Sequence, residues 1–514
     1  MKRMMQCCRF AMVVFGLLFP VSAIDAQTSS RNNLSSDAHN LVGSRPNIVF
    51  VLTDDQGMGD LSCMGNKVLK TPHIDDLYAH SIRLTDFHVS PTCAPTRSAL
   101  MSGRPPFKVG VTHTIRQRER MALDVFTMPQ MLKSAGYTTG LFGKWHLGDE
   151  QEYLPQSRGF DEVLMHGAGG IGQTRHGDFA ANEENLYFDN VLLHNDTVVR
   201  TRGFCTDLFF QAALNWIKKQ NESSSPYFAY IALNAPHAPL VAPKKYTQRF
   251  IDLGYDQGTA GRYGMIENID DNVGLLMQKL ADWNALDDTL VIFMTDNGAT
   301  HLSGSLNGKK VSHFNFNMRG SKNSPHEGGT HVPAFFRWKG VLGEGVDVDA
   351  LTDHVDVYPT FAELAGAVLP NDMQTLEGRS LLPLLIDNES DWPDRELFIH
   401  CGRWNEGQRA AAKYTKSGVR TERWRLIDHA QLYDIAADPG ESKNVAASNP
   451  QVIKRLQDAF DQWWESTLPL MVNEGLPAIG PHEQPFARRY EQQMKEQGIP
   501  DWAPAEAFTL RSTP

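Results

Sequence analysis

Three short apolar runs stand out along the chain, and each is followed at once by polar residues. They are Asn47–Thr53, Pro226–Leu233 and Thr289–Thr295. Continuous apolar runs of this length, rich in β-branched residues, are typical of strands that are buried on both faces of a parallel sheet. A fourth strand is predicted over Thr138–Phe142. The pattern thus indicates a sheet whose strands end in polar turns.

Helical patterns separate these strands. Thr71-Pro72 predicts a capped helix start, and Met128–Ser134 predicts a short helix that Gly136 closes. Apolar residues then recur at steps of three and four, which is one face of an amphipathic helix: Ile266, Ile269, Val273, Leu276 and Leu280. Asp353–Thr360 predicts the start of another helix. Strands that alternate with helices favour an α/β fold, with a large, mostly parallel sheet between layers of helices.

The pattern changes after about residue 385. Short strands such as Trp424–Ile427 alternate with turns, and Val452, Leu456, Phe460 and Trp463 mark one amphipathic helix. We therefore predict a catalytic domain over residues 46–385 and a smaller C-terminal α+β part over 386–514. That part has an antiparallel sheet, one helix and a tail that wraps the surface. Residues 149–225 show few periodic signals and are interpreted either as a long loop region lining a cleft or as a variable surface insertion.

The N-terminus has the layout of a secretory signal peptide. Basic residues precede an apolar run over 10–21, and small residues at 22–26 offer cleavage positions. We expect residues 1–26 to be a leader, residues 27–45 to be a flexible lead-in, and the protein to be exported to the periplasm or outside the cell. An uncleaved N-terminal anchor is the alternative. After cleavage we expect no stable membrane insertion.

Composition narrows the possible partners. The chain has 514 residues and a formal net charge of −11, so its overall field does not attract polyanions such as nucleic acid. A polyanionic substrate would need a local basic pocket. Past the leader only four cysteines remain, too few for a disulfide scaffold, and no essential disulfide is expected.

Two of the polar turns predict a cation site. Asp54-Asp55 follows the first strand, and Asp296-Asn297 follows the last. Carboxylate and amide oxygens without His or Cys suit Ca²⁺ or Mg²⁺ better than Zn²⁺. Taken alone, the first pair could equally be a solvated turn with a helix cap. Ligands of open α/β sheets gather outside the carboxyl ends of strands, which favours the site.

The other two strands end in basic residues. Lys144 and His146 are two residues apart, so on an extended backbone they lie on one side and Trp145 on the other. His237 lies between two prolines, which fix a non-helical backbone. A lone Lys or His is usually solvated. The shared side and the strand-end position make Lys144 and His146 better candidates.

One run is chemically distinctive: Cys93-Ala-Pro-Thr-Arg97 followed by Leu100-Met-Ser-Gly-Arg104. A thiol near a guanidinium is a candidate nucleophile, because positive charge favours the thiolate. The run closely resembles the signature of the type I sulfatases, with conservative variants at Thr96 and Ser102. Gly143–Gly148 resembles the second sulfatase signature, and the segment that ends in Pro-His237 resembles a third element.

The resemblance covers the chain from about residue 46 to 441 and implies an alkaline-phosphatase-like fold. It implies that Cys93 is oxidised by a maturation enzyme to formylglycine, whose hydrate attacks sulfur and forms a covalent sulfate intermediate. It implies one Ca²⁺, with the following metal ligands: Asp54, Asp55, Cys93 as formylglycine, Asp296 and Asn297. It further implies six catalytic positions: Cys93, Arg97, Lys144, His146 as the base, His237 as the proton donor, and Lys322 in a segment that matches more loosely.

The function expected from the resemblance is hydrolysis of sulfate esters, with sulfated carbohydrate or aryl sulfate as substrate. Two alternatives stay open. One is a phosphonate or phosphate ester hydrolase of the alkaline phosphatase superfamily, and the other is a catalytically silent sulfoglycan-binding protein with unmodified Cys93. The natural substrate does not follow from the motifs. The candidates for substrate-specificity residues are Arg175, His176, His301, His313, Arg403 and Trp404.

Overall fold

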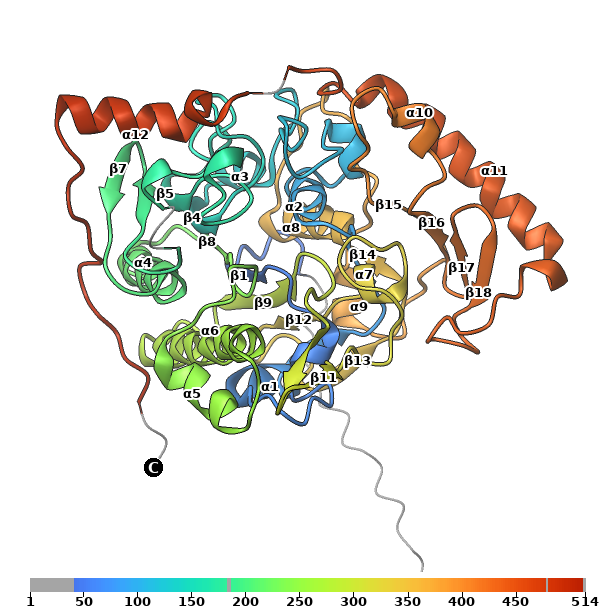
Figure 1. Ribbon diagram of the computed structural model, residues 1–514, viewed down its shortest axis with the longest axis horizontal. Coiled ribbons are helices and arrows are strands. Elements are labelled where there is room, and N and C mark those ends of the chain that lie inside the picture. The colour runs from blue at the N-terminus through green and yellow to red at the C-terminus, as the bar shows by residue number, and fades with distance from the viewer. Residues whose placement is uncertain (1–40, 183–185, 478, 512–514) are drawn as a thin grey trace, which may run out of the picture.

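A computed structural model describes residues 41–182, 186–477 and 479–511 (Figure 1). The predicted leader and most of the lead-in lie outside these residues. Among the described helices, none is long and apolar enough to cross a membrane. The four cysteines beyond the leader all carry free thiols.

The centre of the molecule is one ten-stranded sheet. In spatial order its strands are β13 (Val346–Val348), β2 (Ile82–Leu84), β12 (Ala334–Arg337), β9 (Thr289–Thr295), β1 (Asn47–Thr53), β8 (Tyr227–Ala232), β4 (Thr138–Lys144), β5 (Glu162–His166), β6 (Val191–His194) and β7 (Thr197–Arg200). The five strands from β9 to β5 are mutually parallel. Antiparallel pairs join β12 to β9 and β6 to β5. The carboxyl ends of the five parallel strands therefore share one edge.

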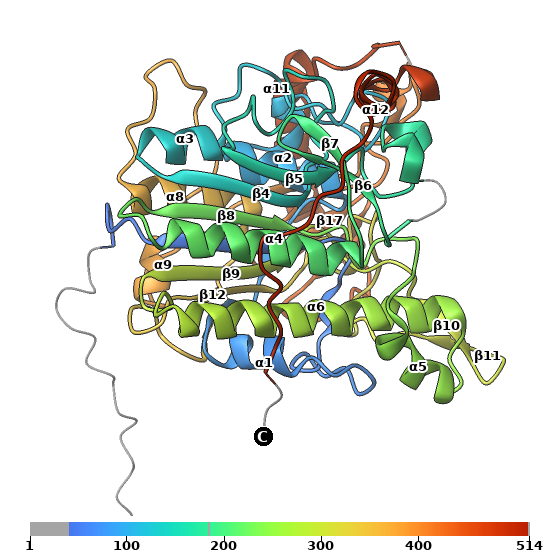
Figure 2. The ribbon, with the colours of Figure 1, turned by 90° about the vertical axis from the view of Figure 1, so that its left-hand side faces the viewer.

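Helices cover both faces of this sheet. One face carries α2 (Cys93–Ser102), α3 (Met128–Ser134), α8 (Val357–Ala365) and α9 (Leu382–Ile386), and the other carries α1 (Pro72–Ala79), α4 (Cys205–Gln220) and α6 (Gln257–Asp282), with α5 (Lys244–Asp252) packed on α6. Figure 2 shows α4 and α6 running alongside the strands. Alternate residues of β1 enter the two cores: Phe50 packs on one face and Val51 on the other. The predicted fold class is confirmed.

A second sheet forms the C-terminal part. Its four antiparallel strands are β15 (Leu397–His400), β16 (Ser417–Arg420), β17 (Trp424–Ile427) and β18 (Gln431–Asp434), with α11 (Pro450–Thr467) packed against them (Figure 1). Smaller elements complete the chain: β3 (Phe87–His88) with β14 (Thr352–Asp353), β10 (Ser303–Leu306) with β11 (Lys309–Ser312), α7 (Glu327–Thr330), α10 (Arg409–Ala412) and α12 (Pro485–Glu496). The domain boundary near residue 385 stays a prediction.

Two expectations differ from the structure. Residues 149–225 are not mainly loop, because they contain β5, β6, β7 and the sixteen-residue α4. The segment after residue 470 contains α12, although its end does run over the surface, where Trp502 N–H donates to the Arg200 carbonyl.

Candidate active site

Four oxygen-bearing side chains meet at the carboxyl ends of β1 and β9. Asp54, Asp55, Asp296 and Asn297 are all almost fully buried. The Asp55 N–H lies 3.4 Å from Oδ1 of Asp296, and the Asn297 amide donates to Oδ1 of Asp55 over 2.8 Å. The two predicted pairs therefore face one another, as the strand order requires.

Two cations from other elements hold this acidic cluster. The Lys144 ammonium, at the end of β4, lies 2.6 Å from Oδ2 of Asp54. Arg97, in α2, binds Oδ2 of Asp296 through Nε at 3.0 Å, and its other nitrogens donate to the carbonyls of Lys144 and Leu233. All three nitrogens of the Arg97 guanidinium are therefore occupied by hydrogen bonds to other residues of the protein. Arg97 links α2 to the ends of three strands.

The donor set fits a hard cation. Oδ1 of Asp54 and Oδ1 of Asn297 are buried and accept no hydrogen bond within the described residues. An unsatisfied buried oxygen is costly, so these atoms call for a ligand. Burial raises the pKa of Asp54 to about 7 despite Lys144, and burial together with Asp54 raises the pKa of Asp296. A bound cation would relieve this crowding of negative charge, and oxygen donors suit Ca²⁺.

Cys93 begins α2, so its sulfur lies at the positive end of that helix. It is buried, and its Sγ lies 4.0 Å from the Lys322 ammonium. Burial alone would raise the pKa of the Cys93 thiol, but Lys144 and Lys322 bring it below its ordinary value. Lys322 also lies 2.5 Å from Oδ1 of Asp55. The distant segment that bears Lys322 therefore does reach the nucleophile.

Hydrogen bonds fix the tautomers of both predicted histidines. Nε2 of His146 contacts the Thr114 carbonyl at 2.8 Å, and Nδ1 of His237 contacts the Ala238 carbonyl at 2.7 Å. A carbonyl only accepts, so those nitrogens carry hydrogen. Nδ1 of His146 is buried, and its lone pair has no hydrogen-bond partner among the residues that the structure describes. Burial lowers the pKa of His146 well below its ordinary value, which keeps this nitrogen unprotonated.

The predicted geometry of the Lys144–His146 segment was only half right. Both side chains do reach the site while Trp145 packs in the core, but β4 ends at Lys144, and His146 has φ of +64°. The turn, not an extended strand, aims the His146 ring. The His146 ring can take this position because residue 169 is a glycine: the Cβ of any other residue at 169 would lie 2.5 Å from the His146 ring.

These groups open into a cavity of about 170 Å³, lined by Cys93, Thr114, Ile115, His146, Gly169, Gln173, His176, His237, Lys322 and Arg403. Of the predicted specificity candidates, His176 and Arg403 line it, whereas Arg175, His301, His313 and Trp404 do not. Sequence reasoning missed Thr114 and Gln173. The cleft-lining interpretation holds for the part of 149–225 that contains Gly169, Gln173 and His176.

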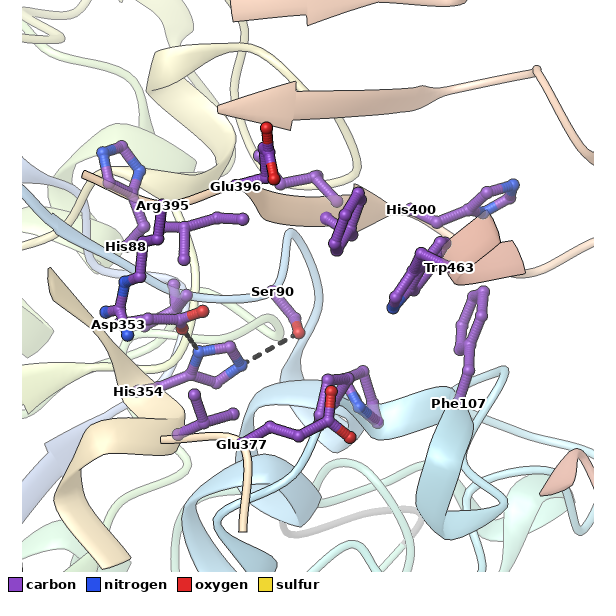
Figure 3. A pocket seen from close by; sticks show the side chains of 17 residues that line it. His88, Ser90, Phe107, Asp353, His354, Glu377, Arg395, Glu396, His400 and Trp463 are labelled. Atoms are coloured by element: carbon purple, nitrogen blue, oxygen red, sulfur yellow. Dashed lines mark hydrogen bonds and ion pairs between the residues drawn. The ribbon is translucent and has the colours of Figure 1, made fainter. Parts of the chain in front are cut away.

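A separate cavity of about 110 Å³ lies between the two sheets (Figure 3). The Ser90 hydroxyl donates to Nε2 of His354 over 3.1 Å, and Nδ1 of His354 donates to the Asp353 carboxylate. Phe107 and Trp463 form its apolar side, with their rings stacked at 5.8 Å. Ser90 lies three residues before Cys93, so this chain of hydrogen bonds anchors the approach to α2.

Comparison with known proteins places the molecule in a family. The family model described as Sulfatase matches residues 46–367, and the model described as N-sulphoglucosamine sulphohydrolase, C-terminal, matches residues 321–465. Human N-acetylgalactosamine-6-sulfatase is 29% identical over 82% of this chain and 86% of its own length. Human arylsulfatase A is 30% identical over 81% of this chain and 87% of its own length.

A solved structure agrees. The crystal structure of Ps i-CgsB in complex with k-i-k-neocarrahexaose has a TM-score of 0.71 and 28% identity, and the match covers 88% of this chain and 98% of that one. The fold is therefore alkaline-phosphatase-like, and the protein is a sulfuric ester hydrolase. The chain belongs to the sulfatase family, as its motifs indicate.

Proposed function

We propose that this protein hydrolyses sulfate esters of sulfated carbohydrates, with formylglycine made from Cys93 as its nucleophile. The observation that carries the proposal is the position of Cys93: it begins α2 at a pocket that also holds Lys322, His146 and His237. The N–H groups and dipole of α2 favour a bound anion. Sulfate needs such a cationic, donor-rich surface before it can be attacked.

A calcium ion is proposed as part of the site, held by Asp54, Asp55, Asp296, Asn297 and the modified Cys93. When bound, it would polarise the sulfate and offset its charge. The unpaired oxygens of Asp54 and Asn297 support this assignment. Lys144 and Arg97 act as positioning residues here, because each is occupied by a carboxylate of the cluster.

The formylglycine hydrate supplies two hydroxyl groups on one carbon. One hydroxyl would lose its proton to solvent and attack sulfur, the S–O bond to the ester oxygen would break as that oxygen gains a proton from His237, and a sulfate ester of residue 93 would remain. His146 then takes the proton of the second hydroxyl through Nδ1, the C–O bond to sulfate breaks, and the aldehyde returns. The lone pair on Nδ1 and the lowered pKa of His146 suit a base. A plain serine could not expel sulfate in this way.

The leaving oxygen needs a proton. His237 and Lys322 both line the pocket, and Nε2 of His237 lies 3.9 Å from Oδ2 of Asp55. We assign proton donation to His237 and sulfate contact to Lys322. The neighbouring Asp55 carboxylate favours the charged ring, which partly opposes the burial that lowers the pKa of His237.

Export and maturation complete the proposal. Residues 1–26 would be removed as a leader, residues 46–385 would form the catalytic domain, and residues 386–514 would form the C-terminal part. A formylglycine-generating enzyme would act on the Cys-x-Pro-x-Arg core at Cys93. Substrates would be met in the periplasm or outside the cell.

The decisive experiment is the mass of the tryptic peptide Leu84–Arg97, from protein secreted by its own host. Replacement of the Cys93 sulfur by aldehyde oxygen, together with turnover of p-nitrophenyl sulfate, supports the proposal. Cys93→Ser should lose turnover, whereas Cys63→Ser, at a half-buried thiol outside the pocket, should keep it. If Cys93 were unmodified in all of the protein, the result would favour a catalytically silent sulfoglycan-binding protein. If a phosphonate ester were turned over faster than the sulfate ester, the result would favour a phosphonate or phosphate ester hydrolase.

A further inference from the structure

We infer that the mouth of the pocket recognises a second anionic group on the substrate, a sulfate or a carboxylate beside the sulfate ester that is cleaved. This inference rests on the proposed function. The residues that carry it are Arg403 and His176, which line the cavity, and Arg116 and Arg175, which are sequence neighbours of the lining residues Ile115 and His176. They come from three segments that are distant in the sequence. The substrate class is therefore a multiply charged sulfated carbohydrate.

Two of these arginines stand on a rigid platform. The Arg403 N–H donates to the Thr112 carbonyl over 3.0 Å, and Arg118 donates to the Trp404 carbonyl over 2.7 Å. The Arg118 guanidinium also lies 4.8 Å from the centre of the Trp404 ring. These bonds fasten residues 112–118 of the catalytic part to residues 402–404 of the C-terminal part, so the backbone segments that carry Arg116 and Arg403 are held close together.

The charges on this platform are unevenly satisfied. Glu474 pairs with Arg118 at 2.7 Å and accepts from Thr112 and Trp404. Within the described residues, neither Arg116 nor Arg403 has a carboxylate at ion-pair distance, although both side chains are exposed. Acidic residues outnumber basic ones in this chain, 60 to 49, so most arginines can find a carboxylate partner. Arginines at the pocket that have no such partner are therefore candidates for binding an anionic ligand.

The backbone holds these arginines at some cost. Arg116 has φ of 67°, Gln117 of 60° and Arg403 of 62°. Side-chain residues in the left-handed region persist where the surroundings over-determine them, and they cluster at ligand sites. Two of these three strained positions, Arg116 and Arg403, bear the unpaired charges.

Neighbouring histidines report the resulting positive potential. Burial lowers the pKa of His113 to about 3, and Arg118, Arg403 and Arg116 all contribute. Burial lowers the pKa of His176 as well, with Arg116 and Arg175 next in importance. Arg116 favours the neutral form of both rings. Arg403 and His176 line the same cavity as Cys93, so the two segments that bear them border one space.

A second anion would therefore bind one sugar or one substituent away from the reacting sulfate. Guanidinium groups suit this task, because they bind sulfate and carboxylate through paired hydrogen bonds. Neutral His176 would add one donor. Such a site raises the affinity for doubly charged substrates without touching the reacting atoms, so it should change binding rather than chemistry.

The test is calorimetric binding to Cys93→Ala protein, which cannot be matured. Three probes are compared: a disulfated disaccharide, a monosulfated disaccharide with a carboxylate, and a monosulfated disaccharide with no second charged group. We expect the first two, or one of them, to bind about tenfold more tightly than the third, as loss of a charged hydrogen bond predicts. The more tightly bound probe identifies the second anion. Its affinity should fall as NaCl screens the charges.

Substitutions make the test specific. Arg116→Gln and Arg403→Gln should each remove most of this preference, Arg403→Lys should restore part of it, and the exposed Arg202→Gln outside the pocket should change nothing. Equal binding of all three probes, binding of none, or equal losses for all three in the Gln variants would overturn the inference. Turnover of p-nitrophenyl sulfate by mature enzyme is measured separately, so failure of the proposed function remains distinguishable.

Discussion

The protonation of two histidines decides how the residues share the chemistry. His146 uses Nε2–H to bind a carbonyl and keeps Nδ1 free, whereas His237 uses Nδ1–H and keeps Nε2 free. The two rings thus present opposite nitrogens to the pocket. Burial lowers the pKa of both, but only His237 has Asp55 beside it to favour a proton. This asymmetry supports the proposed roles of His146 as the base and His237 as the acid.

Replacement of His237 by alanine should cost activity in proportion to the basicity of the leaving group. General acid catalysis is worth about 10²–10⁴-fold, so kcat/KM for an alkyl or sugar sulfate should fall by that order. For an activated aryl sulfate the loss should be about tenfold or less, because its leaving group needs little protonation. Steady-state kinetics with a series of sulfate esters measures this difference. Parallel losses across the series would contradict the assignment of the proton to His237.

At the scale of elements, local sequence predicted the catalytic framework well. The apolar runs of β1 and β9 end directly before Asp54-Asp55 and Asp296-Asn297, so the positions of the strands and of the proposed metal ligands follow together. The helix α4 escaped notice because apolar residues crowd its sequence: Phe209-Phe210 and Ala212–Leu214 blur the period of 3.6. Which face of α4 is buried becomes clear only when the helix is seen packed against the ten-stranded sheet.

The rim of the site was harder to predict, for a different reason. Thr114 and Gln173 have no distinctive local pattern, and they reach the pocket through turns whose conformation depends on distant contacts. Arg403 approaches Cys93 only because the C-terminal sheet docks beside residues 112–118. Motifs report chemistry that is local in sequence, whereas the lining of this cavity comes from several separate segments.

The segment between β3 and α2 contains Ser90, whose replacement by alanine should affect stability rather than turnover. Ser90→Ala removes the hydroxyl that binds His354, without touching the pocket of Cys93. Loss of one buried hydrogen bond should lower the free energy of unfolding by about 1 kcal/mol. We expect kcat/KM for p-nitrophenyl sulfate to stay within about twofold of the unmodified sequence, since Arg97 still anchors α2.

Urea unfolding and steady-state kinetics on the same preparation check this expectation. A Ser90→Ala protein of unchanged stability would show that the hydrogen bond to His354 contributes nothing. A large loss of turnover in a fully stable protein would instead give the Ser90–His354–Asp353 chain a part in the chemistry.

At the scale of the whole molecule, one buried carboxylate joins the two sheets. Glu327, in α7 of the catalytic part, accepts from Arg420 of β16 over 3.1 Å and from Nε of Arg425 of β17 over 3.0 Å. Within the catalytic part it binds His331. Burial alone would raise the pKa of Glu327, but Arg425 and His88 hold it well below its ordinary value. Arg403, which lines the pocket, lies in the segment between β15 and β16 of the sheet that this junction holds.

Glu327→Gln should destabilise the protein by about 3–5 kcal/mol at neutral pH, because it leaves two buried guanidinium groups under-compensated. The pH dependence has a definite sign. A depressed folded-state pKa contributes stability above the unfolded pKa of about 4.3, and this is lost as pH falls toward the folded value. The gap between the native sequence and Glu327→Gln should therefore be full at pH 7 and narrow below about pH 4.

Urea unfolding at a series of pH values measures that gap. The matched control is Glu465→Gln, which alters an exposed pair with Lys413 at 3.4 Å and should cost less than about 1 kcal/mol at any pH. If the Glu327→Gln gap stayed constant with pH, the ion pairs would not be its source, and lost packing would be. If the variant were stable but lost its preference for doubly charged ligands, the junction would serve to place Arg403 rather than to hold the fold.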